Sequence, residues 1–249
     1  MNEMRPKPAR KVALIQLVPN VMTVAAVCAG MTAIRYAVQG HISWAVGFIM
    51  LAAILDGLDG RMARLVNGQS EMGAELDSLA DMLNFGVAPA LVLYFWGMQD
   101  TSSLGWLAVL VYAVCCLVRL ARFNVGNKSE GGDDVTSHFT GVPAPAGAIL
   151  ALVPIYLTRA FPALDPLPVG AIVVYLLLIA YLMISHIPTP SFKSTRINRE
   201  HVKFVLVGVG IFGAGIVTHV WITLLLSCAF YTVLVILGWL STLKQKAKP

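Results

Sequence analysis

Four aspartates in one stretch of this sequence have the spacing of a metal-binding cluster. Asp56 and Asp59 are three residues apart, and Asp77 and Asp81 are four apart, so each pair lies on one face of a helix. Carboxylate ligation without Cys or His favours Mg²⁺, Mn²⁺ or Ca²⁺ over zinc or copper. The pattern predicts a site for one or two divalent cations.

The depth of these carboxylates supports the same prediction. Asn67-Gly68-Gln69-Ser70 is a turn signal, so the flanking helices are expected to form an antiparallel hairpin. Each aspartate pair lies about ten residues from this turn, which is roughly 15 Å along a helix. Unpaired charges at that depth are costly, and Arg61 and Arg64 are too few to neutralise four acids. We expect bound metal and a phosphate-bearing substrate; the alternative is an acid and arginine cluster that only joins two helices.

The composition indicates the elements that must position these residues. The chain has 249 residues, of which 57% are hydrophobic and 12% charged, and its mean hydropathy is +0.75. Soluble chains carry about 25% charged residues, so a soluble monomer and a disordered chain are both excluded. Long apolar runs favour helices over a barrel. We predict an all-α integral membrane bundle of about eight transmembrane helices, within a range of six to eight, at residues 18–38, 42–65, 72–98, 103–124, 139–161, 167–187, 202–219 and 221–240.

The positions of the basic residues predict the orientation of the chain. The net charge is +5, and with eight spans and a cytoplasmic N-terminus 16 of the 18 Lys and Arg lie inside. Only Arg35 and Arg159 lie outside. This positive-inside bias predicts a multi-pass protein of the cell inner membrane, with cytoplasmic termini and a site open to the cytoplasm. It indicates contact with a lipid bilayer and no nucleic-acid partner. A single domain over 1–249 is expected, with basic cytoplasmic segments at 1–14 and 241–249.

The aspartate stretch resembles a known signature. It reads D-x2-D-G-x2-A-R-x8-G-x3-D-x3-D from Asp56 to Asp81, and it is similar at every fixed position to that of the CDP-alcohol phosphatidyltransferase family. The resemblance implies a membrane enzyme that transfers a phosphatidyl group from a CDP-linked lipid to an alcohol and releases CMP. It implies two metals, Mg²⁺ or Mn²⁺. Asp56, Asp59 and Asp77 would hold one, and Asp56, Asp77 and Asp81 the other, with Asp81 also serving as general base.

The same resemblance implies a set of residues that bind the CDP-lipid. Gly60, Arg64 and Ser70 match positions that contact the phosphates, small Ala63 leaves room for the nucleotide, and Gly73 is part of the signature. Glycines cost a helix interior about 1 kcal/mol each, so Gly60 and Gly73, like Gly57, are better explained by close approach of a ligand or another helix.

A shorter motif precedes the signature. Pro19-Asn20-x-x-Thr23 resembles the family's P-N-x-x-T, in which Asn20 and Thr23 would touch the cytidine. The alternative is a helix-opening proline followed by polar caps.

Three further segments bear on the alcohol acceptor. Residues 84–90 (N-F-G-V-A-P-A), 119–124 (R-L-A-R-F-N) and 139–146 (F-T-G-V-P-A-P-A) resemble the bacterial and archaeal phosphatidylserine synthase branch of the family. The substrates so implied are CDP-diacylglycerol and L-serine. Arg119 and Arg122 share a helical face and could bind the serine carboxylate, together with Asn84; the alternative for the arginines is anchoring at a cytoplasmic helix end.

Other functions and an oligomer are also considered. Choline, glycerol 3-phosphate or inositol phosphate are alternative acceptors for the same chemistry. From another class, the acids could belong to a divalent-cation or proton-coupled transporter, although their placement toward one side of the membrane favours the enzyme. Four glycines in the seventh run suggest tight helix packing and a homodimer: Gly208, Gly210, Gly213 and Gly215.

Overall fold

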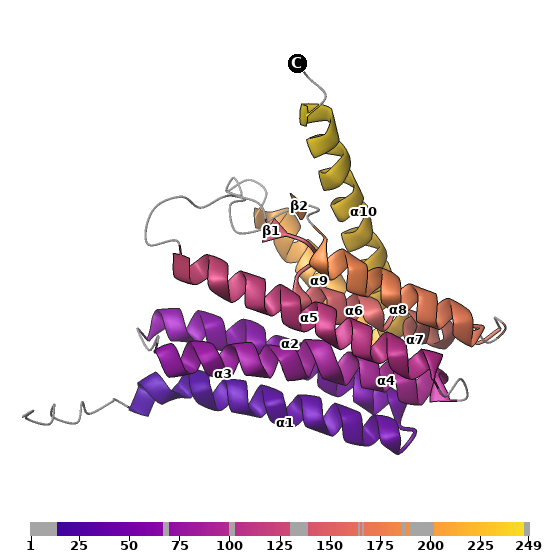
Figure 1. Cartoon of the computed structure of the whole chain (residues 1–249), viewed down its shortest axis with the longest axis horizontal. Coiled ribbons are helices and arrows are strands. Elements are labelled where there is room, and N and C mark those ends of the chain that lie inside the picture. Colours follow the sequence, from indigo (N-terminus) through magenta and orange to yellow (C-terminus); the bar gives the residue numbers. More distant parts are fainter. Residues whose placement is uncertain are drawn as a thin grey trace, which may run out of the picture.

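The computed structural model of the chain is a helical bundle (Figure 1). The residues that it describes are 14–66, 70–99, 103–129, 139–163, 165, 167–185, 188–189 and 202–246. The expected turn at Asn67-Gly68-Gln69, nearly all of the basic segment 1–14, and the end of the basic tail lie outside these residues. The rest of the expected tail is helical as far as Lys246, so 241–246 continues the last helix.

The described elements confirm the all-α membrane bundle. The one departure among them is a two-residue strand pair, in which Phe139 of β1 lies opposite Thr189 of antiparallel β2. Five helical segments are long and apolar enough to cross a membrane, and three shorter apolar helices bring the total to eight. The elements are η1 (Leu14–Leu17, 3-10), α1 (Val18–Val38), α2 (Ile42–Leu65), α3 (Glu71–Asp81), η2 (Met82–Val87, a π-helix), α4 (Ala88–Gly97), α5 (Leu104–Ser129), β1 (Phe139–Thr140), α6 (Ala144–Ala151), α7 (Val153–Ala160), α8 (Val169–Ile184), β2 (Pro188–Thr189), α9 (Val202–Thr218) and α10 (Val220–Lys246).

The expected run 139–161 is wrong as a single helix. Gly141, at φ +83°, follows β1, and a Cβ there would lie 2.6 Å from the carbonyl oxygen of Met183. Pro143 then directs the chain into α6, and the helix is interrupted at Leu152 because Pro154 has no N–H for the next hydrogen bond. The segment therefore consists of a turn and two short helices: the turn and α6 pack against α8, and α7 packs against α10.

Small side chains bring α1 and α2 together. Ala26, Ala29 and Ala33 of α1, and Ala45 and Ala52 of α2, are buried, which lets the two backbones approach closely. The helices are joined at Gly40, whose φ of +78° reverses the chain. Gly40 and His41 donate their N–H groups to the carbonyls of Ala37 and Tyr36, an arrangement that closes the end of α1. The hairpin carries Thr23 and Asp59 on facing helices.

Two prolines each leave one backbone carbonyl without its helical hydrogen bond, and a different tyrosine hydroxyl donates to each of these carbonyls. An α-helical N–H normally bonds the carbonyl four residues earlier, and proline has none to donate. Pro154 leaves the carbonyl of Leu150 without this bond, and the Tyr175 hydroxyl donates to it at 2.9 Å. Pro89 does the same to Phe85, whose carbonyl accepts from the Tyr112 hydroxyl at 3.0 Å. In an apolar bundle this second partner matters, because an unsatisfied carbonyl there is costly.

The four glycines of the expected dimer face differ in how closely other residues pack on them. A Cβ at Gly215 would lie 2.6 Å from Thr223 Oγ1, so this glycine allows α9 to pack closely on α10. Gly208, Gly210 and Gly213 have no such neighbour within 4 Å and are exposed. Only Gly215 is thus explained by packing within the chain, and the dimer stays a prediction.

Gly30 provides a test of the packing between α1 and η2. A Cβ at this position would overlap Oδ1 of the fully buried Asn84, so Gly30→Ala is expected to destabilise the protein by about 1 to 3 kcal/mol. Gly47→Ala is the matched control, because nothing lies within 4 Å of the added methyl and helix propensity alone should stabilise by up to about 1 kcal/mol. Thermal unfolding in detergent measures both; equal melting temperatures would contradict the packing of Asn84 on Gly30.

Candidate active site

Three of the four predicted aspartates form one cluster. Asp56 and Asp59 lie in the C-terminal half of α2 and Asp77 in α3, and one carboxylate oxygen from each lies within 4.8 Å of the others. Because α1 packs on both α2 and α3, it holds the two helices at this spacing. Three carboxylates so close together repel one another strongly unless a cation lies between them. The arrangement therefore fits a divalent metal ion.

Asp81 lies at the edge of this cluster. It is one helical turn beyond Asp77, at the end of α3, and its carboxyl group lies next to that of Asp56. Asp81 Oδ1 and Asp59 Oδ1 are both buried, and neither has a hydrogen-bond partner among the described residues. Buried carboxylate oxygens are unfavourable without a partner. These two oxygens are therefore suited to a metal or a substrate group.

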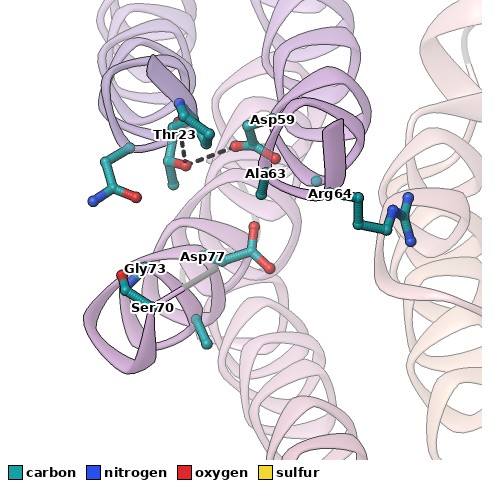
Figure 2. Close-up of a pocket in the computed structure, with 11 residues that line it drawn as sticks. Thr23, Asp59, Ala63, Arg64, Ser70, Gly73 and Asp77 are labelled. Carbon is teal, nitrogen blue, oxygen red and sulfur yellow. Dashed lines mark hydrogen bonds between the residues drawn. The ribbon is translucent and has the colours of Figure 1, made fainter. Parts of the chain in front are cut away.

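Thr23 of α1 binds one of the aspartates directly. Its hydroxyl oxygen lies 2.7 Å from Asp59 Oδ2 and 3.0 Å from the Pro19 carbonyl oxygen (Figure 2). Thr23 and Asp59 are 5% and 3% exposed, so this bond is protected from water. The hydroxyl fixes one carboxylate oxygen and leaves Oδ1 of the same group without a partner. Thr23 also lines the pocket described next, so its expected contact with cytidine stays a prediction.

All seven predicted CDP-lipid residues lie around one pocket of about 270 Å³. The pocket lies between α1, the end of α2 and the start of α3, and two of the clustered aspartates reach it. Asp59 and Asp77 face one another there, as Figure 2 shows. The lining residues are Pro19, Asn20, Thr23, Asp59, Gly60, Ala63, Arg64, Ser70, Gly73, Ala74 and Asp77.

Local structure explains why the pocket is open at the start of α3. Ser70 caps this helix, its hydroxyl oxygen accepting the N–H of Gly73 at 3.0 Å. A Cβ at Gly73 would lie 3.0 Å from Asn20 Oδ1, so this glycine lets α1 approach α3. A Cβ at Gly60 would have no neighbour within 4 Å, because this residue faces the pocket. A Cβ at Gly57 would also lie in open space. A helix N-terminus in such a pocket favours an anionic ligand.

The guanidinium of Arg64 lies apart from the aspartates. Figure 2 shows the side chain extending away from Asp59 and Asp77, although the residue lines the pocket. Arg64 is exposed, as is Arg61 one turn earlier. A contact between Arg64 and a bound phosphate therefore requires its side chain to turn toward the pocket.

The three predicted acceptor residues do not line this pocket. Arg119 lies near Asp81, and its Nε donates to the Val142 carbonyl. Arg122 Nη1 donates to the Ile184 carbonyl at 3.2 Å. Asn84 is fully buried in η2, and neither its oxygen nor its nitrogen has a hydrogen-bond partner among the described residues. The structure thus brings Arg119 to the aspartates, while Arg122 joins α5 to the end of α8.

Two positioning contacts could not be recognised in the sequence. Asn124 Nδ2 donates to Ser78 Oγ at 2.9 Å and joins α5 to the helix that carries Asp77 and Asp81. The Thr23 contact with Asp59 spans 36 residues. Asn124 belongs to the R-L-A-R-F-N segment, and its polarity at the end of an apolar run was the available signal.

Comparison with known proteins finds a matching family model and several relatives that share one name. A family model described as CDP-alcohol phosphatidyltransferase matches residues 16–190. A CDP-diacylglycerol–serine O-phosphatidyltransferase of Mycobacterium leprae is 39% identical over 226 residues, 89% of this chain and 75% of the relative. Its namesake in Mycobacterium tuberculosis is 51% identical over 147 residues, 58% of this chain and 50% of the relative. The Bacillus subtilis namesake is 34% identical over 177 residues, 71% of this chain and 91% of the relative.

The Thr23 hydroxyl provides a test of the metal site. Thr23→Val removes the bond to Asp59 Oδ2 while nearly keeping the side-chain volume, and loss of such an outer contact typically weakens metal binding about 10- to 100-fold. The control is Thr32→Val on the same helix, where the hydroxyl bonds only its own helix at the Cys28 carbonyl. Manganese titration of both proteins measures the effect. Equal affinities would show that Thr23 does not orient a metal ligand.

Proposed function

This chain belongs to the CDP-alcohol phosphatidyltransferase family, and on that premise we propose that it transfers the phosphatidyl group of CDP-diacylglycerol to the hydroxyl of L-serine. The products are phosphatidylserine and CMP. The main support is the pocket in which all the expected CDP-lipid residues meet Asp59 and Asp77. The relatives described above are named for the same reaction.

The reaction is a direct displacement at phosphorus. The serine hydroxyl oxygen forms a bond to the phosphorus that carries diacylglycerol, and the bond from that phosphorus to the CMP oxygen breaks. The Asp81 carboxylate accepts the hydroxyl proton, which suits its place at the edge of the cluster and its buried oxygen without a partner. Because the serine hydroxyl attacks the phosphorus directly, the reaction needs no covalent phosphatidyl-enzyme.

Different parts of the chain would bind the metal ions and the pyrophosphate of the substrate. Asp56, Asp59 and Asp77 would hold one divalent cation, and Asp56, Asp77 and Asp81 would hold a second, with Mg²⁺ or Mn²⁺ as the expected ions. When bound, such ions neutralise phosphate oxygens and the charge that develops on the leaving CMP. The N-terminus of α3, capped by Ser70, favours the pyrophosphate in the pocket.

The acceptor lies on the opposite side of the cluster in this proposal. Arg119 is close to Asp81, and its Nε is already bound to the Val142 carbonyl, so its remaining N–H groups are suited to the carboxylate of serine. Choline and inositol phosphate have no carboxylate. The buried amide of Asn84, one turn beyond Asp81, has no hydrogen-bond partner in the part of the chain that the structure describes. Arg122 also joins α5 to α8 through Nη1, and its role at the acceptor stays a prediction.

The proposed site opens to the cytoplasm. The pocket lies between the C-terminal end of α2 and the N-terminal end of α3, where Arg61 and Arg64 also lie. With the eight spans expected from the sequence, 16 of the 18 basic residues are expected on this side, and the positive-inside rule then favours the cytoplasmic face of a cell inner membrane. Serine and CMP are water-soluble and can exchange there.

An acceptor assay tests the function. Purified protein with CDP-diacylglycerol and manganese is expected to form phosphatidylserine and CMP from labelled serine, and no product from choline, glycerol 3-phosphate or inositol phosphate. Product from one of those acceptors but none from serine would overturn the assignment of serine. Ion flux into liposomes without CDP-lipid, together with no transferase activity, would indicate the transporter instead.

The role of Asp81 is tested by one amide substitution. Asp81→Asn removes the proton acceptor and is expected to lower kcat at least about 100-fold. Asp165→Asn is the control, because this exposed aspartate lies on the segment before α8, away from the cluster. A release assay for CMP measures both variants. Full activity of Asp81→Asn would exclude Asp81 as the base.

A further inference from the structure

The π-helical segment η2 begins directly after Asp81 and contains Asn84. Its wider turn is visible in the bond from the Ala88 N–H to the Leu83 carbonyl, five residues apart. Compared with a regular α-helix, this turn changes the angle between Asp81 and Asn84 about the helix axis. The relative direction of the proposed base and the proposed acceptor amide therefore depends on η2 keeping its π form.

Pro89 and Tyr112 together account for that form. In a regular helix the Phe85 carbonyl would accept the N–H of residue 89, which proline lacks. The Tyr112 hydroxyl takes the place of this N–H at 3.0 Å, and Tyr112 is fully buried. Without the hydroxyl, the Phe85 carbonyl would lie in an apolar interior without a hydrogen-bond partner, and this cost would favour a rearrangement of η2.

One face of α5 follows η2 and the end of α3. Tyr112, Cys116 and Arg119 are spaced i, i+4 and i+7, so they lie on one face of the helix. Tyr112 bonds Phe85, Cys116 packs so closely on Gly86 that a Cβ there would lie 3.1 Å from its sulfur, and Arg119 lies near Asp81. On the other side, Gly30 of α1 leaves just enough room for Asn84.

We propose that Tyr112 is a positioning residue for the acceptor: its hydroxyl holds η2 in the π form and so sets the directions of Asp81 and Asn84. This inference rests on the proposed transferase function. The CDP-lipid pocket lies on the α1, α2 and N-terminal α3 side, and neither η2 nor Tyr112 lines it. Tyr112 should therefore affect the use of serine much more than the binding of the nucleotide.

The chain contains a matched control for this bond. Tyr175 makes the same kind of contact, a hydroxyl donated to a carbonyl that a proline has freed, at the α6–α7 break. The two distances, 2.9 and 3.0 Å, are nearly equal. Tyr175 lies on α8, and its partner Leu150 belongs to α6, so neither residue carries a proposed site group. Loss of this hydroxyl should lower stability alone.

Tyr112→Phe and Tyr175→Phe form the experiment. Both are expected to lower the melting temperature in detergent by similar amounts. Only Tyr112→Phe should raise KM for serine and lower kcat, by about tenfold in kcat/KM, with KM for CDP-diacylglycerol unchanged within about twofold. Equal effects of the two variants on serine kinetics would overturn the proposal. An inactive wild-type protein would instead contradict the proposed function itself.

Pro89→Ala separates positioning from stability. It supplies the missing N–H, so the Phe85 carbonyl can bond within a regular helical turn even without the tyrosine hydroxyl. In the Tyr112→Phe background it is expected to restore the melting temperature but leave the serine defect in place. Recovery of both would show that the hydroxyl acts through stability alone and would overturn the proposal. If Tyr112→Phe does not fold, Pro89→Ala alone is used for the same comparison of melting temperature with serine kinetics.

Discussion

The repulsion among the carboxylates of Asp56, Asp59 and Asp77 is the constraint around which the bundle is organised. With oxygens within 4.8 Å of one another, these groups would separate if their helices could move apart. Buried alanines hold α1 against α2, and Gly73 lets α1 approach α3, so α1 prevents that movement. The rigid cradle keeps the charge concentrated, and a concentrated negative charge at a partly buried site is what binds a divalent cation tightly.

Backbone hydrogen bonding sets the second constraint, because a bundle in lipid has little water to satisfy a freed carbonyl. At Pro89 and at Pro154 a tyrosine hydroxyl from another helix takes the missing role. The chemical solution is the same in both places, but the consequences differ with location. At Pro154 the break divides α6 from α7, whereas at Pro89 the altered turn directly follows Asp81. The bond from the Tyr112 hydroxyl to the Phe85 carbonyl therefore also affects the geometry of the neighbouring site.

Local sequence features determined what could be predicted. The spans 18–38 and 42–65 agree with α1 and α2 because apolar run length and the turn at Gly40 define both ends. Six of the eight signature residues, all except Asp56 and Asp81, line one pocket because their spacing fits two packed helices. The π form of η2 depends on Tyr112, 27 residues from Phe85, and the arginine contacts span 23 and 62 residues. Such long-range partners leave no periodic trace in a single sequence.

The arginines decide between a metal site and a cluster that only joins helices. In the second case Arg61 and Arg64 would be buried against the aspartates as their counter-ions. Both are exposed instead, and the Arg64 guanidinium points away from Asp59 and Asp77. The negative charge of the cluster is therefore left to attract a cation, while the positive charge of Arg64 is left to attract phosphate. This separation of the two charges supports the proposal that a metal-bound pyrophosphate, which carries both signs, binds in the pocket.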